Sequence, residues 1–330
     1  MNRRNVCRAL CALSVTLAVR AAAQPAVPYR ITWVSMDDAA PRPPMLDAFR
    51  EGMSAIGYVE GKSYVVDALW GGGSADRLQQ MTQDRLRDTT RGSTDIFVVQ
   101  GGAALPPVLR SVKSEPVVFS ISADPVEGKF VRSYAHPGGN VTGITLFTGE
   151  LVAKRIALLQ EVLPRMQRLA VLANPQHPGA GVELQNAKAA ASRLSIDLLY
   201  FPASTEAELD AAFAKIAGSR VDAVIAFTDG FALASAERIA AFSLRQRVPV
   251  ASGWAEFARR GNLMTYGPVF TDVYRRLATY VDRIRKGADP ADLPVEQPTR
   301  LELVINMHTA KALGIAIPQT MLLRADEIIQ

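Results

Sequence analysis

The stretch that decides the fold consists of YRITWVS (Tyr29–Ser35), PMLDAFREGMSAI (Pro44–Ile56) and YVVDALW (Tyr64–Trp70). The first and third segments are short and rich in β-branched and aromatic residues, which is typical of strands. The middle segment ends at Gly57 and has apolar residues at helical spacing: Met45, Phe49, Met53 and Ile56. A strand, a helix and a second strand in this order predict a βαβ unit with parallel strands.

The alternation of strand and helix continues along most of the chain. Strands are also expected at Asp95–Gln100, Val117–Ser122, Val141–Thr145, Arg168–Ala173, Ile196–Phe201, Ala223–Phe227 and Val248–Ala251. Helices are expected at Ala75–Thr90, Ala103–Val112, Glu150–Leu163, Gly179–Leu194, Glu206–Gly218 and Phe231–Arg245. Because the pattern starts again after residue 145, it predicts an α/β fold of two similar, doubly wound parallel-sheet lobes. Pro137–Gly143, with its proline and three glycines, is expected to carry the hinge between them.

The C-terminal part alternates less regularly. It predicts an amphipathic helix at Thr271–Lys286, a connector at Ala288–Pro298 and a strand at Leu301–Asn306, and two short helices follow at Thr309–Leu313 and Thr320–Leu323.

Residues 1–23 have the order of a signal peptide. Three arginines precede the apolar run Leu10–Val19, and Ala21-Ala22-Ala23 offers a cleavage site. The run of about ten residues is far shorter than the roughly 20 needed to span a membrane as a helix. We therefore expect a periplasmic protein with no stable membrane insertion once the leader is removed, and leave open whether it is exported by the Sec or the twin-arginine route.

Removing the leader changes the composition. It carries four of the 37 basic residues and no acid, so 33 basic residues face 32 acidic ones in the remaining chain, a net charge of +1. This balance argues against nucleic acid as a partner. Both cysteines, Cys7 and Cys11, also leave, so disulfides and thiolate metal sites are excluded from the exported chain.

The residues that catalysis commonly uses are scarce. The three histidines, His136, His177 and His308, have no metal-ligand spacing and are expected to be solvated or capping. The chain also lacks the G-x-S-x-G nucleophile elbow and a complete phosphate-binding loop. The sequence therefore predicts no enzyme activity, no metal and no cofactor.

Ligands of open α/β sheets bind beyond the carboxyl ends of the strands. In this chain those ends carry small, polar or glycine residues: Ser35, Asp38, Gln100, Gly101, Gly102, Ser122, Asp124, Thr145, Asn174 and Asp229. We expect the Gly101-Gly102 turn and Ser122 to hold a carboxylate, since backbone N–H groups there can be approached closely. Asp124 or Asp229 would meet an ammonium group. Whether Asp37 and Asp38 enter the pocket stays open.

Several motifs occur in the order found in one known family. They are Arg50-Glu51-Gly52, Gly57–Lys62, Ala123–Val126, Pro137–Gly143, Ala173-Asn174-Pro175, Met264–Pro268 and Leu301–Asn306. From Tyr29 to Ile329 the chain resembles the ABC-transporter substrate-binding proteins of the TrpX-like family. The resemblance implies two lobes of the class I periplasmic-binding type, joined by three crossing segments. The first lobe would comprise 28–143 plus 268–287, and the second 144–267 plus 288–330.

The resemblance also implies an amino-acid ligand, aromatic in the best-known cases. It places the Gln100-Gly101-Gly102 turn, Asp124, Asn174 and Tyr266 at the cleft. Tyr266 and Phe147 would wall an apolar or aromatic ligand side chain. The chain departs from the family at Met36–Ala39 and at Gln100, where relatives have smaller residues, so the ligand cannot be copied from them.

The sequence therefore predicts a monomeric solute-binding protein. It would capture a small ligand between two lobes and deliver it to the permease of an ABC transporter. A ligand sensor for a periplasmic receptor domain is the first alternative, and a non-metal α/β enzyme is the second.

Overall fold

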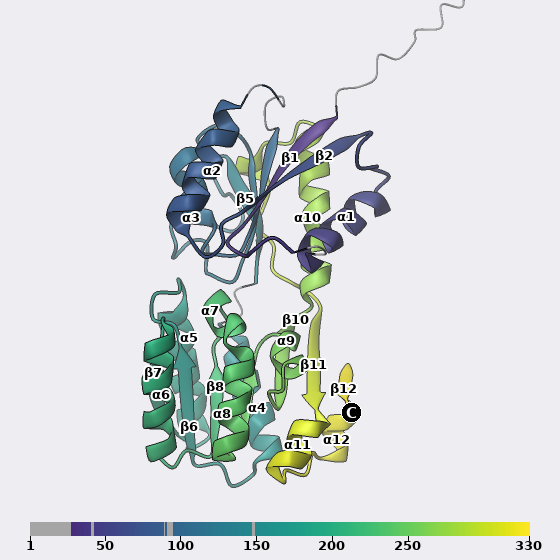
Figure 1. The fold of residues 1–330 in the computed structure, drawn as a ribbon. Coiled ribbons are helices and arrows are strands. Elements are labelled where there is room, and N and C mark those ends of the chain that lie inside the picture. The colour runs from purple at the N-terminus through teal and green to yellow at the C-terminus, as the bar shows by residue number, and fades with distance from the viewer. Residues whose placement is uncertain (1–27, 41–42, 89, 91–94, 147–148) are drawn as a thin grey trace, which may run out of the picture.

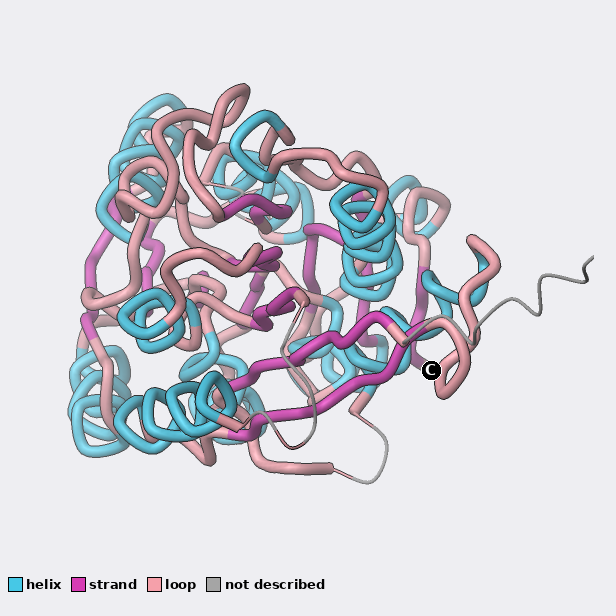
Figure 2. Tube along the Cα trace, turned by 90° about the horizontal axis from the view of Figure 1, so that it is seen from above, coloured by secondary structure: helices cyan, strands magenta, loops and turns pink. Residues whose placement is uncertain are grey.

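The computed structural model describes residues 28–40, 43–88, 90, 95–146 and 149–330, so the predicted signal peptide and Phe147 lie outside the described residues. Two α/β lobes lie one above the other, each built around one sheet (Figure 1). Seen along the long axis of the molecule, helices lie on several sides of the strands, and some strands reach the outline of the molecule (Figure 2). The predicted fold class is confirmed.

The sheet of the first lobe has five parallel strands in the order β2-β1-β3-β4-β5. They are β1 (Tyr29–Ser35), β2 (Tyr64–Trp70), β3 (Ile96–Gln100), β4 (Val117–Ile121) and β5 (Val141–Thr145). Four helices belong to this lobe: α1 (Pro44–Ala55), α2 (Ala75–Arg87), α3 (Leu105–Ser111) and α10 (Phe270–Arg285).

Alternating side chains of the strands supply two separate cores. Ile31 and Trp33 of β1 pack with Phe49 of α1 and with the apolar face of α10. Val34 faces the other way, toward a core that includes Leu78 of α2. The helices α1 and α10 therefore cover one face of the sheet and α2 and α3 the other, as expected when parallel strands are buried on both sides.

The sheet of the second lobe has seven strands in the order β12-β11-β10-β9-β8-β6-β7. They are β6 (Arg168–Ala173), β7 (Asp197–Pro202), β8 (Ala223–Ala226), β9 (Val250–Ser252), β10 (Met264–Pro268), β11 (Leu301–Asn306) and β12 (Glu327–Ile329). The helices are α4 (Leu151–Val162), α5 (Ala180–Arg193), α6 (Glu206–Gly218), α7 (Gly230–Ala234), α8 (Ala236–Gln246), α9 (Ala255–Arg259), α11 (Met307–Leu313) and α12 (Gln319–Leu322).

The second lobe differs from the sequence-based expectation in several places. The strands β10 and β12 and the helix α9 were not among the expected elements. The single helix expected at Phe231–Arg245 is in fact two helices, which meet at Ser235. The sequence did not reveal this break, because the apolar residues keep their helical spacing across it. The strand β11 runs antiparallel to β10. Between β10 and β11 the chain passes through α10 in the first lobe, so it leaves and re-enters the second lobe at the same edge of the sheet and β11 runs back alongside β10.

The crossings between the lobes lie later in the chain than predicted. Pro137–Gly143 does not carry the hinge, because it leads into β5 and its last three residues pair with β4. Residues 288–298, expected in the second lobe, pack on the first: Thr142 Oγ1 donates to Leu293 O (2.6 Å) and Glu296 N to Gly143 O (3.0 Å). The chain therefore crosses after β5, between β10 and α10, and between Glu296 and β11.

No helix within the described part of the chain is both long and apolar enough to cross a membrane.

Candidate ligand-binding site

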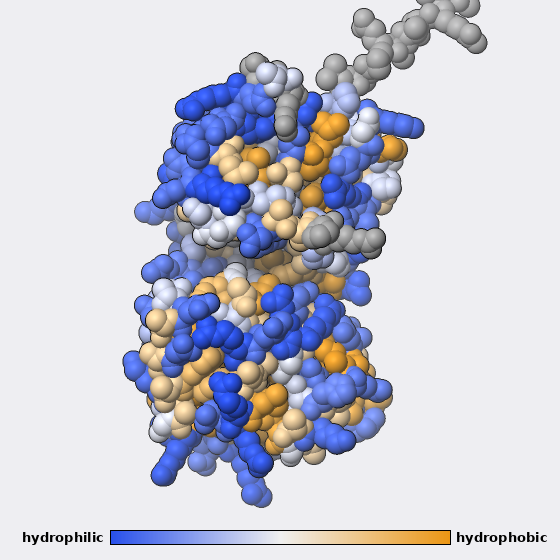
Figure 3. Space-filling model, viewed as in Figure 1, coloured by the Kyte–Doolittle hydropathy of each residue, from blue (hydrophilic) through white to orange (hydrophobic). Residues whose placement is uncertain are grey.

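The carboxyl ends of the parallel strands in the two lobes face each other across a narrow waist. The waist is visible on the surface of the molecule, with α7 at the top of the lower lobe (Figures 1 and 3). This is the edge at which open α/β sheets bind ligands.

In the first lobe, most of the predicted polar side chains hydrogen-bond locally. Ser35 is buried and its hydroxyl accepts from Asp37 N (3.1 Å), while Gln100 Nε2 donates to Asp37 Oδ2 (2.7 Å). Buried Thr145 donates to Ala123 O (2.7 Å). Asp37 and Asp38 are exposed at the end of β1. These groups shape the edge of the first lobe.

The Gly101-Gly102 turn offers less than the sequence suggested. Gly101 takes a positive φ of 87°, and its N–H donates to Ser120 O (2.8 Å), so that donor is already used. A side-chain carbon added at Gly102 would meet only the Cβ atoms of Ala123 and Ile121, at 3.9 and 4.0 Å. A ligand can therefore approach the turn closely at Gly102, but the N–H group of Gly101 is not available to bind it.

The two candidate acids differ in their surroundings. Asp124 Oδ1 accepts from Val126 N (2.8 Å) and Glu127 N (3.1 Å), so it closes a turn. Burial, with the negative charge of Asp124 nearby, raises the pKa of Tyr134 to about 12. Asp229 is 4% exposed, and its Oδ1 caps α7 by accepting from Ala232 N (2.6 Å). Within the part of the chain that the structure describes, its Oδ2 is buried without a hydrogen-bond partner.

A side-chain hydrogen bond joins the two lobes at this edge. The distance from Ser122 Oγ to His177 Nε2 is 2.8 Å. Ser122 follows β4 of the first lobe, and His177 lies in the turn after β6 of the second. Burial lowers the pKa of His177, and the charge of Asp229 opposes the shift. The expectation that His177 is solvated or capping was wrong for this histidine, whereas His136 and His308 are exposed.

A buried ion pair that the sequence analysis missed lies behind Asp229. Arg155 of α4 is 1% exposed, and its Nη1 is 2.9 Å from Glu183 Oε1 of α5. Arg155 Nε also donates to Tyr266 O of β10 (2.8 Å). Arg155 lies between Val152 and Ile156 on the apolar stripe of α4, a position that could have indicated a buried arginine. The pair ties α4, α5 and β10 together beneath the waist.

Glu183 makes stability depend on pH. Burial raises its pKa from about 4.5 to about 7, although Arg155 acts in the opposite direction. Between these pH values the native state holds a proton that the unfolded state has lost, so stability falls as the pH rises, by at most about 1.4 kcal/mol per pH unit. Denaturant unfolding from pH 4.5 to 8 is therefore expected to show a steeper loss in the wild type than in Glu183→Gln. Parallel curves for the two proteins would contradict this assignment.

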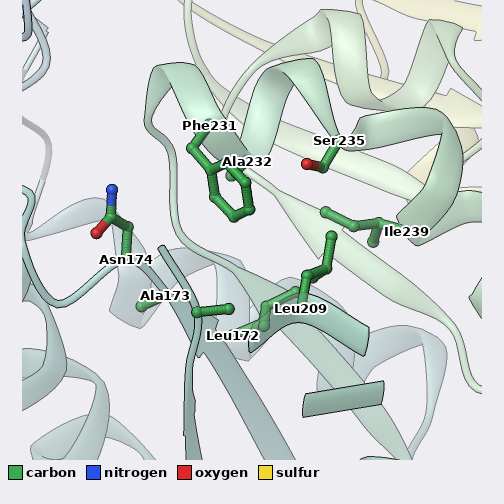
Figure 4. Close-up of a pocket in the computed structure, with 9 residues that line it drawn as sticks. Leu172, Ala173, Asn174, Leu209, Phe231, Ala232, Ser235 and Ile239 are labelled. Atoms are coloured by element: carbon green, nitrogen blue, oxygen red, sulfur yellow. The ribbon is translucent and has the colours of Figure 1, made fainter. Parts of the chain in front are cut away.

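Asn174 lies at the same edge but bonds within its own turn, where its Oδ1 accepts from Gln176 N (2.9 Å). It also lines a cavity of about 10 Å³ beneath α7, and its amide points away from Phe231, Leu209 and Ile239 (Figure 4). That volume is about the minimum that holds one water. The cavity is therefore too small for a metabolite.

A larger hollow of about 560 Å³ lies at the opposite end of the second lobe. Its lining comes from the residues that precede β6 and β8 and from the loop after α11, including Met166, Asp222 and Ile315. These positions are at the amino ends of the strands, so this hollow is separate from the waist.

The structure thus divides the predicted residues into two groups. Ser122, Asn174, Asp229 and Tyr266 are linked by contacts and charge through His177, Glu183 and Arg155. The second group lies at the edge of the first lobe, where the hydrogen bonds described above are local; it comprises Ser35, Asp38, Gln100, Gly101, Gly102, Asp124 and Thr145. Among the described residues no group of His, Cys, Asp and Glu could hold a metal ion.

A family model described as ABC transporter substrate binding protein matches residues 41–329. A tyrosine-binding protein of Clostridioides difficile (strain R20291) is 20% identical over 276 residues, covering 82% of this chain and 78% of the relative.

Solved structures share the two-lobed fold. An ABC domain from Streptococcus pneumonia in complex with L-Trp has a TM-score of 0.83 and 20% identity, over 92% of this chain and 100% of that one. A conserved domain protein from Vibrio cholerae has a TM-score of 0.82 and 26% identity, over 92% and 100%. A ligand-free, open substrate-binding protein from Clostridium difficile has a TM-score of 0.69 and 19% identity, over 92% and 99%.

Proposed function

Because the chain belongs to the ABC transporter substrate-binding protein family, we propose that it captures an amino acid between its lobes and presents it to the permease of an ABC transporter. The tyrosine-binding relative and the L-Trp complex support an aromatic amino acid as the ligand. The leader supports export to the periplasm, where the chain acts as a monomeric carrier and not as an enzyme.

The main support for an amino-acid ligand is the Oδ2 atom of Asp229, which is buried without a hydrogen-bond partner among the described residues. A buried carboxylate oxygen without a partner is costly, since buried polar groups are normally hydrogen-bonded. It lies just after β8, at the edge of the sheet that faces the first lobe. An ammonium group supplies the charge and the donors that this oxygen lacks. Asp229 is therefore proposed as the partner of the ligand amine.

Other residues at the waist are suited to the carboxylate and the side chain of an amino-acid ligand. Gly102 and Ser122 of the first lobe are proposed to meet the carboxylate, because Gly102 leaves space and Ser122 supplies a hydroxyl. Tyr266 is partly buried and held in place through its backbone by Arg155, so it is proposed to pack against the ligand side chain. A ring there buries a large area with little loss of entropy.

Replacing Asp229 with asparagine tests the proposal. Asparagine still caps α7, but it removes the charge that meets the amine, so we expect affinity to fall about 100-fold. Isothermal titration of L-tryptophan and L-tyrosine into protein refolded to remove carried ligand would measure the change. Asp124→Asn is the matched control, since Asp124 is already used by its own turn, and it should bind nearly as the wild type.

Two outcomes would contradict this proposal. If Asp124→Asn loses affinity and Asp229→Asn does not, the amine lies against the first lobe. If neither amino acid binds the wild type, the ligand is not an aromatic amino acid.

A further inference from the structure

The hydrogen bond between Ser122 and His177 joins the two lobes directly, without a ligand between them. We propose that these two residues form a latch that stabilises the closed arrangement of the lobes, whatever ligand is bound. The inference rests on the proposed function in one respect: it assumes that the protein works by opening and closing around a solute.

The latch residues come from opposite lobes and meet at the waist. Ser122 follows β4 of the first sheet and His177 follows β6 of the second, and their side chains approach to 2.8 Å. A bond of this kind exists only when the lobes are close. In an open form, both groups would bond to water instead, so the bond favours closure specifically.

The turn that carries His177 is rigid before the latch forms. His177 N donates to Asn174 O (3.2 Å), and Ala180 N donates to His177 O (3.0 Å). Prolines at 175 and 178 restrict the backbone on both sides of the histidine. A preorganised group loses little entropy when it forms a hydrogen bond, so most of the bond's free energy is available for closure.

The chemistry of the pair suits a bond between neutral groups. Burial lowers the pKa of His177, which favours the neutral imidazole, so one ring nitrogen donates and the other accepts. The serine hydroxyl can donate to Nε2 or accept from it, so the latch forms in either tautomer. The neighbouring Asp229 links the latch to the proposed amine site, because a ligand ammonium would share the surroundings of His177.

The latch predicts a specific pattern of effects. A single neutral hydrogen bond contributes enough to change the closed-to-open ratio about five-fold. Where the closed form is the minor form without ligand, affinity falls by the same factor for every ligand. Ser122→Ala, His177→Ala and the double variant should therefore lower the ligand-free closed-to-open ratio equally, about five-fold each, because the second substitution removes nothing further. Ser122→Ala should lose more affinity than His177→Ala, because it also loses the hydroxyl that is proposed to meet the ligand carboxylate.

Single-molecule fluorescence transfer would measure closure directly. The dyes go on exposed positions of the two lobes, Ser114→Cys and Lys215→Cys, in the full chain with Cys7→Ser and Cys11→Ser. We expect the three latch variants to shift the ligand-free distribution toward the open form by one common factor. His177→Gln, which keeps a group able to bond Ser122, should restore closure. His136→Ala, an exposed histidine that also precedes a proline, is the matched control and should change nothing.

Titration of the labelled proteins with L-tryptophan separates the two proposals. If L-tryptophan closes none of the proteins, the proposed ligand class fails, and the ligand-free distributions still decide the latch. Unchanged ligand-free distributions in Ser122→Ala and His177→Ala would overturn the latch. Additive effects in the double variant would also overturn it, because they would mean that the two residues act separately.

Discussion

Arg155→Met is expected to lower the free energy of unfolding by about 3–5 kcal/mol at pH 8. Arg155 is buried against Glu183, with 2.9 Å between Nη1 and Oε1, and at this pH the carboxylate is ionised. Methionine has a similar length but no charge, so Glu183 loses the cation that lowers its pKa and must stay buried either as an unpaired anion or as a carboxyl that has taken up a proton. The variant also loses the hydrogen bond to Tyr266 O, which positions β10 at the waist.

The pH dependence of this loss distinguishes charge from packing. Below its raised pKa, Glu183 takes up a proton and no longer needs a cation, so the loss should be smaller at pH 6 than at pH 8. The double variant Arg155→Met/Glu183→Met should recover most of the stability, since replacing a whole buried ion pair by apolar residues is often neutral. Urea unfolding of the wild type and the two variants at both pH values measures these effects. An equal loss at both would indicate packing alone.

Gly267→Ala is expected to cost about 3 kcal/mol or to prevent folding. A Cβ at Gly267 of β10 would lie 1.9 Å from Gly253 O, a backbone atom in the residue that follows the neighbouring strand β9. No rotamer change relieves this contact, so β9 and β10 would have to separate. Since Tyr266 adjoins Gly267, ligand binding should weaken as well.

The control for this substitution is Gly218→Ala. Gly218 ends α6, and a Cβ there would meet nothing within 4 Å. Alanine is the better helix residue by up to about 1 kcal/mol, so this variant should be as stable as the wild type or more stable. Thermal unfolding of both variants measures the difference. A similar loss in both would show that the short contact at Gly267 relaxes easily.

In the proposed function, the two lobes share one site. The proposed amine partner, Asp229, and the proposed aromatic wall, Tyr266, both lie on the second lobe. The first lobe contributes Ser122 and the open space at Gly102. A ligand that contacts both lobes favours their closed arrangement, which is the form that a transporter can recognise.

Local patterns predicted candidate site residues only where they end or follow a strand, whereas Tyr266, which lies within β10, came from the family resemblance. Ser122, Asn174 and Asp229 were found because the carboxyl ends of parallel strands meet at one edge. His177 lies in the same turn as Asn174, but a histidine between prolines carries no sign of a partner 55 residues away. Glu183 was missed because a glutamate in the first turn of a helix is ordinarily solvated.

The sequence by itself determined the order of most strands and helices, the presence of two lobes with mainly parallel sheets, and the membership of the family. These rest on local periodicity, turn residues and ordered motifs, which neighbouring residues specify. Tertiary structure decided where the chain crosses between lobes, the direction of β11, and the association of Arg155, Glu183, Asp229 and His177. Such associations join residues that are far apart in the chain. Their electrostatic interactions become strong only when the residues are buried, so no local pattern of the sequence encodes them.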